Sequence, residues 1–488
     1  MSLYKSLFKQ TAIYGLATVL PRMLSFLLVR LYTDVMPKAD YGSVTIVLSW
    51  MVFFNVILSY GMETAFFRFY NNQDNKQSVV QTTTISIFWS SMVFLIFGLL
   101  TTNYLGKIAD TDPIYISYAV WILVFDALTI IPFSKLRVAQ KTIIFAIIKI
   151  SNVVVNLGLN FFFLVGLPFW VNQNPNIFLL EIYVRNFQIG YIFISNLIAS
   201  CLTMMIFAPD YFKLKWQFDT LLWRKMLQYG WPILIAGLAF GINEHFDKIL
   251  LGKLLPPDIA KSEVGTYAAC YKLGLFMVLF RTAFTLGIEP FFFSHAQNEN
   301  APQTYAAITK YFVIFGSIIL LVVIVFADLL KLLLIPNPDY WAAMKVVPLI
   351  ILANFCLGIY TSLSVWYKLI DKTKIGAYIS IVGAFITLII NYLLIPQFSY
   401  MGSAIATLAA YGTMMAISYW LGQKKYPIPY DMPKILGYLS VSVVLSGLSF
   451  YIPMFRESFV FGIFAILSFG CFIYYNEKNT ILKILKRN

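Results

Sequence analysis

Nine ionisable side chains lie inside long apolar stretches of this sequence, and their types suit the binding of an anion. The cations are Arg22, Lys149, Lys248, Lys272, Arg281 and Lys310, and the anions are Asp126, Glu244 and Asp247. One such residue in a membrane helix costs at least ~2.5–3.5 kcal/mol, so it usually faces a partner or a cavity. Because six cations meet only three anions, part of the positive charge has no evident protein partner. This surplus predicts an anionic ligand bound by arginine and lysine side chains.

The cations differ in how deep they lie in the apolar stretches, and this depth indicates which of them contact the ligand. Arg22 lies near the middle of the first stretch, and Arg281 lies about 24 Å from the outer end of the eighth, at about 1.5 Å per residue. Lys248 and Lys272 lie nearer the outside, and Arg30 lies at the end of the first stretch. We predict that these five side chains contact the ligand. Lys272 and Arg281 are nine positions apart, so they point to opposite sides of the helix unless it bends.

The buried acids predict ion coupling or pairing between helices. In the stretch INEHFDKILLG, residues 242–252, Glu244 and Lys248 are four apart in the favourable order for an intrahelical pair. Asp247 is then left without an obvious partner in its own helix. Asp126 stands alone in its stretch. For these carboxylates, coupling to an ion and a salt bridge to a neighbouring helix both stay open.

A second acidic motif occurs twice. Glu63 in YGMETAFFRF and Glu289 in LGIEPFFF are separated by 226 positions, and Gly61 and Gly287 precede them at the same offset. Both glutamates fall at the predicted cytoplasmic ends of apolar stretches. They either tie a helix end to a neighbour or form a cytoplasmic gate where two lobes meet.

The elements that position these residues are membrane helices. The chain is 60% hydrophobic and 12% charged, whereas soluble domains carry about 25% charged residues. Continuous apolar runs of roughly 20 residues match the thickness of a bilayer, and only helices or closed barrels satisfy backbone groups in lipid. The sequence predicts an all-α integral membrane protein with fourteen helices. They cover approximately 10–33, 41–67, 78–103, 114–134, 143–166, 187–208, 224–252, 265–293, 304–335, 343–367, 375–395, 401–422, 434–454 and 458–475.

Further residues that match at a fixed separation indicate an internal repeat of six helices. Lys141 and Asn160 match Lys372 and Asn391 at one offset of 231, and Gly190 matches Gly402. An even number of helices per copy makes the repeat parallel, and transporters of this kind bind substrate where the halves meet. The predicted parts are a lobe at 1–215, a second lobe at 216–425, and two extra helices with a basic tail at 426–488.

Loop charges predict the orientation. The net charge is +14, and 21 Lys and Arg fall in loops and tails on one side against nine on the other. Because positive residues are enriched on the cytoplasmic side, both termini are expected there. Orientation and attraction to anionic lipids account for the basic charge, so a nucleic acid partner is not predicted.

An enzyme is not predicted either. The chain has no phosphate-binding loop of the form G-x-x-x-x-G-K-[ST] and no large hydrophilic segment. The four cysteines are far apart, so neither a disulfide, a metal site nor a cofactor is expected. A membrane-embedded polysaccharide polymerase remains an alternative from another class.

The order and spacing of several motifs resemble a known family. These are PRMLSFLLVRLYTD in the first helix, D-Y-G before the second, YGWPILIAG and FDKILLG in the seventh, and VGTYAACYKLG and LGIEPFFF in the eighth. Together with the six, six and two arrangement of helices, they resemble the polysaccharide transporters of the multidrug/oligosaccharidyl-lipid/polysaccharide flippase superfamily. The resemblance covers the first twelve helices well and the last two by length.

The resemblance implies a flippase of the bacterial inner membrane. Its members move undecaprenyl-diphosphate-linked oligosaccharides for O-antigen, lipopolysaccharide or capsule by alternating access, and cations in the cavity meet the diphosphate. Arg22, Lys272 and Arg281 fall where this chain would supply them. The last two helices resemble a pair that flanks a groove for the polyprenyl tail. The expected partners are the lipid-linked substrate and membrane lipids, with polymerases or glycosyltransferases as candidates, and a monomer is expected. A lipid II flippase and a multidrug antiporter of the same fold are the alternatives.

Overall fold

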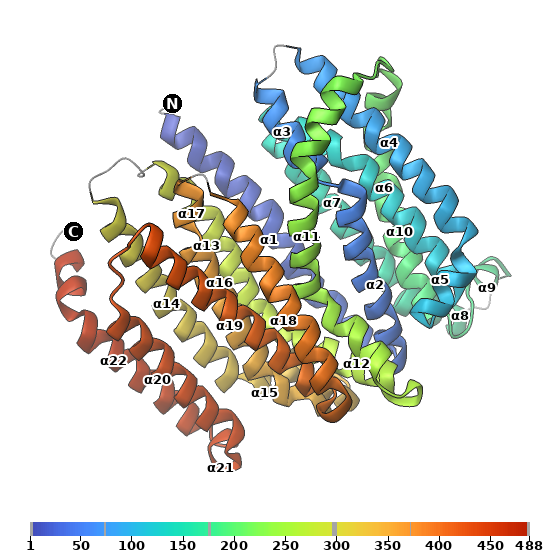
Figure 1. The fold of residues 1–488 in the computed structure, drawn as a ribbon. Coiled ribbons are helices and arrows are strands. Elements are labelled where there is room, and N and C mark those ends of the chain that lie inside the picture. Colours follow the sequence, from blue (N-terminus) through green and yellow to red (C-terminus); the bar gives the residue numbers. More distant parts are fainter. Residues whose placement is uncertain (1–2, 73–74, 174–176, 295–299, 371, 486–488) are drawn as a thin grey trace. The chain divides into compact units, whose positions relative to one another are not determined.

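The computed structural model describes residues 3–72, 75–173, 177–294, 300–370 and 372–485, and every element in them is helical (Figure 1). This confirms the all-α membrane fold. Twelve helical runs among the described residues are long and apolar enough to cross a membrane. The other two predicted stretches coincide with α1 (Leu3–Val35) and α11 (Thr220–Leu254), which are long helices outside that set. The count of fourteen spans is therefore not confirmed.

The chain divides into two compact units, residues 1–268 and 269–488, and each is described separately. The division falls inside α12. It does not test the predicted lobes, 1–215 and 216–425, which stay a prediction.

The first unit is built on α6, which packs against α2, α4, α7 and α10. Its elements are α1 Leu3–Val35, α2 Lys38–Ser59, α3 Met62–Asn72, α4 Lys76–Leu100, α5 Thr102–Ala109, α6 Pro113–Val138, α7 Thr142–Phe161, the π-helical η1 Phe162–Gly166, α8 Leu167–Gln173, α9 Ile177–Ile182, α10 Gln188–Phe212, α11 Thr220–Leu254 and α12 Pro257–Tyr271. Pro113 sits in the first turn of α6, where no amide hydrogen is needed, and Asp112 caps that turn by accepting from Ile114 N–H.

Glycines set two close approaches in this unit. A Cβ atom on Gly42 of α2 would overlap the carbonyl oxygen of Lys261, and one on Gly265 of α12 would overlap that of Lys38. Membrane helices approach closely where small residues face each other. The repeated D-Y-G and E-V-G entries therefore meet at one helix crossing. The second close approach is at Gly61, which has a φ of 75° and packs against Gly230.

Gly61 also ends a predicted helix early. The sequence predicts one helix over 41–67, but Tyr60 and Gly61 both have positive φ and separate α2 from α3. An L-residue such as Tyr60 rarely adopts this conformation, so the break must be held by its surroundings. The Tyr60 hydroxyl lies 2.6 Å from Ser86 Oγ of α4, which supplies one such restraint.

The second unit is built on α16, which packs against α13, α14 and α19. Its elements are η2 Lys272–Gly274, α13 Leu275–Ser294, α14 Ala301–Val325, α15 Ala327–Leu334, η3 Pro338–Val346, α16 Val347–Leu363, α17 Val365–Leu369, α18 Lys374–Phe398, α19 Tyr400–Lys425, α20 Met432–Tyr451, α21 Pro453–Arg456 and α22 Phe459–Leu485, with η2 and η3 being 3₁₀ segments. Gly316 on α14 lets Phe355 of α16 approach closely, because a Cβ there would overlap its ring.

Ion pairs attach the two last helices to this unit. Glu477 of α22 is 3% exposed and accepts from Lys310 of α14 at 2.7 Å, from Lys434 at 3.1 Å and from the Tyr438 hydroxyl at 3.0 Å. Lys310 therefore has a protein partner. The inference that it belongs to an unpaired surplus is wrong, because the predicted last helix ended at residue 475 and Glu477 was left out of the charge balance.

A second attachment lies outside the apolar spans. Arg456 of α21 donates to Asp328 of α15 at 2.7 and 2.8 Å, and Lys331 donates to Asp328 at 2.5 Å. These hydrogen bonds, with that of Arg456 the largest cause, lower the pKa of Asp328 from 3.8 to about 2. The guanidinium also lies 4.3 Å from the Phe450 ring centroid. Both ends of the helix pair α20 and α22 are thus fastened to the rest of the unit.

Candidate functional site

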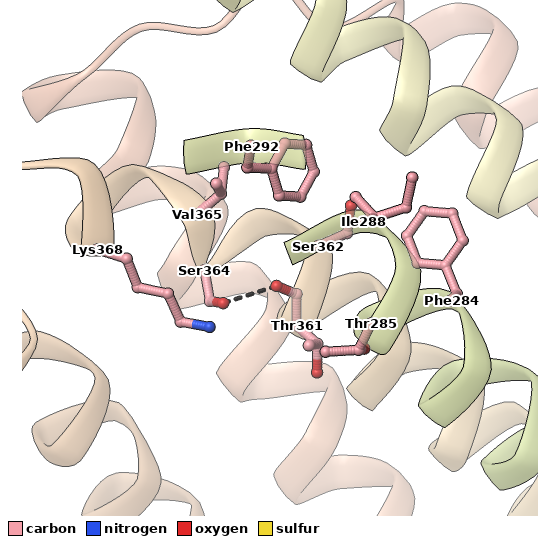
Figure 2. Close-up of a pocket in the computed structure, with 9 residues that line it drawn as sticks. All are labelled: Phe284, Thr285, Ile288, Phe292, Thr361, Ser362, Ser364, Val365 and Lys368. Carbon is pink, nitrogen blue, oxygen red and sulfur yellow. Dashed lines mark hydrogen bonds between the residues drawn. The ribbon is translucent and has the colours of Figure 1, made fainter. Parts of the chain in front are cut away.

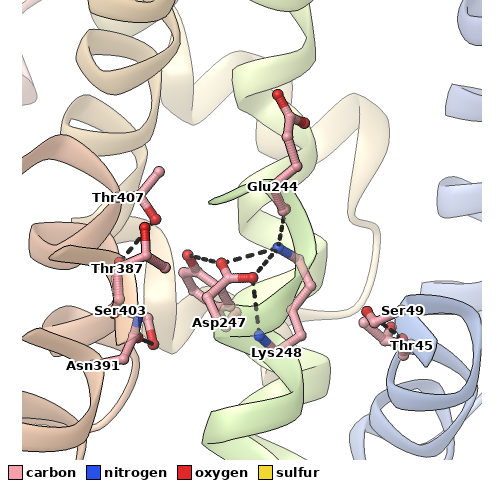
Figure 3. Close-up of polar contacts among 10 residues, drawn as sticks. Thr45, Ser49, Glu244, Asp247, Lys248, Thr387, Asn391, Ser403 and Thr407 are labelled. Atoms are coloured by element: carbon pink, nitrogen blue, oxygen red, sulfur yellow. Dashed lines mark hydrogen bonds and ion pairs between the residues drawn. The ribbon is translucent and has the colours of Figure 1, made fainter. Parts of the chain in front are cut away.

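A buried ion pair occupies the predicted cationic stretch of α11 (Figure 3). Asp247 is 1% exposed and Lys248 is 6% exposed. Lys248 Nζ lies 2.8 and 2.9 Å from the two carboxylate oxygens of Asp247, and the Tyr267 hydroxyl of α12 donates to Asp247 Oδ2 at 2.8 Å. The expectation that Asp247 lacks a partner in its own helix is wrong, because the lysine next to it folds back onto its carboxylate. Glu244 contributes its carbonyl oxygen, 3.5 Å from the same ammonium.

This pair changes what Lys248 offers to a ligand. Its charge is balanced within 3 Å, and three donors hold the Asp247 carboxylate, including the Lys248 amide at 2.9 Å. A buried pair with satisfied hydrogen bonds is strongly destabilised when one partner is removed. Lys248 therefore has a structural role in joining α11 to α12. Its predicted contact with substrate, and ion coupling at Asp247, stay predictions.

Two polar clusters surround the repeated asparagines. Asn160 is buried in the first unit and accepts from the Tyr32 hydroxyl at 2.9 Å. Asn391 is buried in the second unit and accepts from Ser403 Oγ at 2.9 Å, which joins α18 to α19 (Figure 3). Each copy of the repeated residue thus has the same kind of role, a buried amide that receives a hydroxyl from a neighbouring helix.

The arginines lie on different elements. Arg22 and Arg30 are exposed side chains of α1 in the first unit, and Arg22 follows Pro21 within the helix. Arg281 is a half-buried side chain of α13 in the second unit. Lys272 is the first residue of η2, the 3₁₀ turn between α12 and α13. The eighth predicted helix therefore changes its winding at Lys272, and a straight-helix argument about the directions of Lys272 and Arg281 does not apply.

Glu63 lies in the first turn of α3, directly after the break at Gly61. Its Oε1 accepts from Arg137 of α6 at 2.9 Å, and both side chains are about half exposed at 46% and 45%. The Arg137 guanidinium also lies 4.7 Å from the centroid of the Phe67 ring. This ion pair ties α3 to the end of α6. The side chain of Glu289 lies outside the described residues, so a gate formed by the two glutamates remains a prediction.

Asp126 and Glu63 line one polar cavity of about 440 Å³ in the first unit. Asp126 of α6 accepts from Ser200 Oγ of α10 at 2.7 Å, and Asn152 of α7 donates to Thr203 of α10 at 2.9 Å. Asp126, Lys149 and Glu63 were singled out from the sequence, but the uncharged polar residues around them, such as Asn152 and Ser200, were not predicted to belong to a site. Their spacing was a usable signal, because polar side chains recur three or four positions apart along α7 and α10.

The second unit has two hollows of another character. One lies between α14 and α22, has a volume of about 430 Å³, and is lined almost entirely by apolar side chains such as Leu321 and Phe469. The other holds only about 20 Å³, space for roughly one water. Figure 2 shows it among α13, α16 and α17, with Lys368 at one side and Ser364 donating to the Thr361 carbonyl at 2.6 Å.

Comparison with protein families gives the decisive observation. The family described as "Polysaccharide biosynthesis protein" matches residues 7–285, which is more than half of the chain. The chain belongs to the polysaccharide biosynthesis protein family. The MatE family also matches, over residues 232–393. A comparison with curated protein sequences found no match.

Solved structures with the same fold agree with this membership. The lipid II flippase MurJ in an inward closed conformation superposes with a TM-score of 0.74 at 14% identity, covering 95% of this chain and 99% of that one. An inward-facing multidrug resistance MATE family transporter of the MOP superfamily superposes with a TM-score of 0.63 at 11% identity, covering 88% of this chain and 96% of that one. A MATE in the straight conformation superposes with a TM-score of 0.60 at 10% identity, covering 89% of this chain and 97% of that one. The resemblance predicted from the motifs is confirmed, and the chain is a polysaccharide biosynthesis protein with the fold of MOP flippases and transporters.

Proposed function

We propose that this chain is a flippase for an undecaprenyl-diphosphate-linked oligosaccharide, a precursor of O-antigen or capsule, and that it has no enzymatic activity. The observation that carries the proposal is the family match over residues 7–285, which places the chain in polysaccharide biosynthesis. The multi-pass fold suits transport, because fold relatives named as flippases and transporters match over nearly their full lengths. The site of action is the bacterial inner membrane, with both termini in the cytoplasm as the loop charges predict.

The cations support a diphosphate as the group that is recognised. Lys248 already has a carboxylate partner at 2.8 Å, and its contact with the substrate stays a prediction. Arg22, Arg30, Lys272 and Arg281 are the other cations predicted to contact the ligand. Guanidinium groups bind phosphate oxygens in a bidentate way, which makes arginine the stronger choice for this task. Arg22 and Arg281 are therefore the residues that we assign to the diphosphate.

The groove between α14 and α22 supports a long apolar chain on the substrate. Its lining offers Leu321, Phe469 and similar side chains, and a polyprenyl tail would bury apolar surface there with little polar surface to desolvate. The ion pairs at Glu477 and Asp328 keep the two helices α20 and α22 in place beside it.

A panel of bacterial strains tests the proposal. Each strain lacks one flippase for a defined lipid-linked substrate, and the panel includes a strain depleted of its lipid II flippase and one lacking a multidrug antiporter. We expect this chain to restore surface glycan in at least one strain with a missing oligosaccharide flippase. Growth rescue of the lipid II strain would support the fold alternative represented by MurJ. Drug resistance without glycan export would support the antiporter alternative that the MatE match favours and would overturn the proposal.

A further inference from the structure

The polar cavity of the first unit contains charges that the proposed diphosphate contacts do not use. It is lined by residues of α6, α7 and α10, together with Asn55 of α2 and Glu63 of α3, and runs from Asp126 to the ion pair of Glu63 and Arg137. Asp126 and Arg137 are eleven residues apart on α6, a depth of about 16 Å at 1.5 Å per residue. Lys149 of α7 is an exposed side chain that lines the cavity. Its ammonium lies 4.4 Å from the centroid of the Phe133 ring.

Comparison of the two repeat copies shows which cavity residues occur in both copies and which occur only in the first. The offsets of 226 and 231 pair the ion-pair residues Glu63 and Arg137 with Glu289 and Lys368, which keep the charge. The inner residues are replaced. On α6 and α7 the offset is 231, and it pairs Asp126 with Leu357, Lys149 with Ser380 and Asn152 with Gly383. On α10 the offset is 212, which is the separation of Gly190 and Gly402, and it pairs Asn196 with Leu408 and Ser200 with Gly412.

The two copies differ in polarity at these inner positions. The cavity of the first unit holds about 440 Å³. The second unit forms its helix bundle with Leu357 and Ser380 at the positions of Asp126 and Lys149. Asp126 and Lys149 are charged in only one copy, which points to a ligand, since a charge within a membrane-spanning segment usually faces a partner or a cavity.

The composition of the cavity selects a class of ligand. Two acids, Glu63 and Asp126, face two bases, Arg137 and Lys149, so the cavity has no net charge to attract an ion. Among the described residues, Asp126 and Lys149 form no direct ion pair with each other, which leaves a carboxylate acceptor and an ammonium donor for one bound molecule. Amides of Asn55, Asn152 and Asn196 add both donors and acceptors.

A sugar matches this arrangement. Each of its hydroxyls donates one hydrogen bond and accepts others, so one hydroxyl can donate to Asp126 while another accepts from Lys149. The rings of Phe133 and Phe145 provide an apolar surface for the face of the sugar. The volume falls within the ~300–1,000 Å³ that small-molecule sites occupy.

We propose that the cavity between α6, α7 and α10 binds one sugar of the transported glycan and selects among glycans. This inference rests on the proposed flippase function. Asp126 accepts from a sugar hydroxyl, Lys149 donates to another, and Asn196 contributes an amide from α10. The diphosphate and the sugar are then recognised by different residues.

The test measures glycan export in strains whose lipid-linked glycans differ in the sugar next to the lipid. The variants are Asp126→Asn, Lys149→Met and Asn196→Ala, and the control is Thr361→Ala in the small hollow of the second unit. We expect export of at least one glycan to fall about tenfold, the loss of one charged hydrogen bond, with a changed order of preference among glycans. Asn196→Ala removes no charge and no helix-to-helix hydrogen bond, so this variant is expected to fold. It therefore still tests the cavity if one of the charge variants fails to fold. Size-exclusion chromatography of each purified full-length variant checks folding.

Two results would overturn the inference. One is unchanged export of every glycan by all three well-folded cavity variants. The other is an equal loss for all glycans with the order of preference unchanged, which would assign the cavity to ion coupling. If the wild-type chain exports no glycan in any strain, the proposed flippase function itself fails, and the two failures are thereby distinguished.

Discussion

At the scale of single residues, the structure sorts the buried charges by partner. Lys248 pairs with Asp247, and Lys310 pairs with Glu477, in both cases with a carboxylate that is at most 3% exposed. Two of the six cations that the sequence counted as a surplus are thus neutralised by the protein. Sequence reasoning found the charges, because they interrupt apolar stretches. It could not find Glu477 as a partner, because 167 positions separate it from Lys310.

The Asp247–Lys248 pair gives a prediction about stability. Replacing Lys248 with Met leaves Asp247 as a buried charge without its cation, held only by the Tyr267 hydroxyl and the backbone amide of residue 248, and removing one partner of such a pair costs about 3–5 kcal/mol. The double variant Asp247→Asn with Lys248→Met removes both charges and is expected to recover most of that loss. Thermal unfolding of the purified proteins measures both. If Lys248→Met unfolds at the wild-type temperature, the pair does not stabilise the fold.

The arginines give a prediction about transport. Arg22→Ala and Arg281→Ala are each expected to abolish glycan export while protein level and thermal stability stay normal, since a diphosphate contact is worth about 1.5–3 kcal/mol. Lysine at either position is expected to rescue only in part, because it keeps the charge and loses the bidentate geometry. Surface glycan measured beside protein abundance separates this outcome from a folding defect. Full export by the double alanine variant would show that neither arginine holds the diphosphate.

At the scale of elements, continuous apolar runs were sufficient to predict where helical elements lie, and every predicted range contains one or more of them. The interruptions were not predictable. Gly61 packs against Gly230 at the break that follows Tyr60, and the 3₁₀ turn that begins at Lys272 falls inside a range predicted as one helix. The candidate site was only partly predictable for the same reason. Asp126 was identified from its own helix, whereas the cavity around it requires five helices, α2, α3, α6, α7 and α10, to come together.

The attachment of α21 to α15 gives a prediction about pH. The pKa of Asp328 is lowered from 3.8 to about 2 in the folded protein, so the ionised carboxylate stabilises the fold above pH 3.8 and loses this effect as the pH falls toward 2. Because Asp328 is 37% exposed, we expect Asp328→Asn to lower the free energy of unfolding at neutral pH by only about 1 kcal/mol. The difference from wild type should shrink across the acid range. A difference that stays constant from neutral pH down to pH 2 would contradict this assignment, and Arg456→Gln serves as the matched control.

At the scale of the whole molecule, the family and the fold make the chain a polysaccharide biosynthesis protein with the fold of flippases and transporters, and transport of a lipid-linked glycan is our proposal. The family match rests on the first 285 residues, while the apolar groove and the two attachments of the last helices lie beyond them. The fold is shared by relatives named for lipid II and for multidrug resistance, so the fold alone leaves the substrate open. The chemistry of the substrate has to come from side chains, and these are the arginines and the polar cavity of the first unit.

Topology has its own test at this scale. The loop charges predict cytoplasmic termini, and they place Lys213, the residue that follows α10, on the cytoplasmic side as well. A single cysteine introduced at Lys213 in a chain without other cysteines should react with a membrane-impermeant reagent only after the cells are opened. Labelling of that cysteine in intact cells would reverse the predicted orientation.

Direct measurement of flipping tests the central claim. The purified full-length protein is reconstituted into vesicles that contain a labelled polyprenyl-diphosphate oligosaccharide, and a membrane-impermeant oxidant reports how much of the glycan becomes accessible from outside. We predict that wild-type protein moves the glycan from the inner to the outer leaflet and that the Arg22→Ala, Arg281→Ala double variant does so no faster than empty vesicles. Equal accessibility in wild-type, variant and empty vesicles would contradict the account.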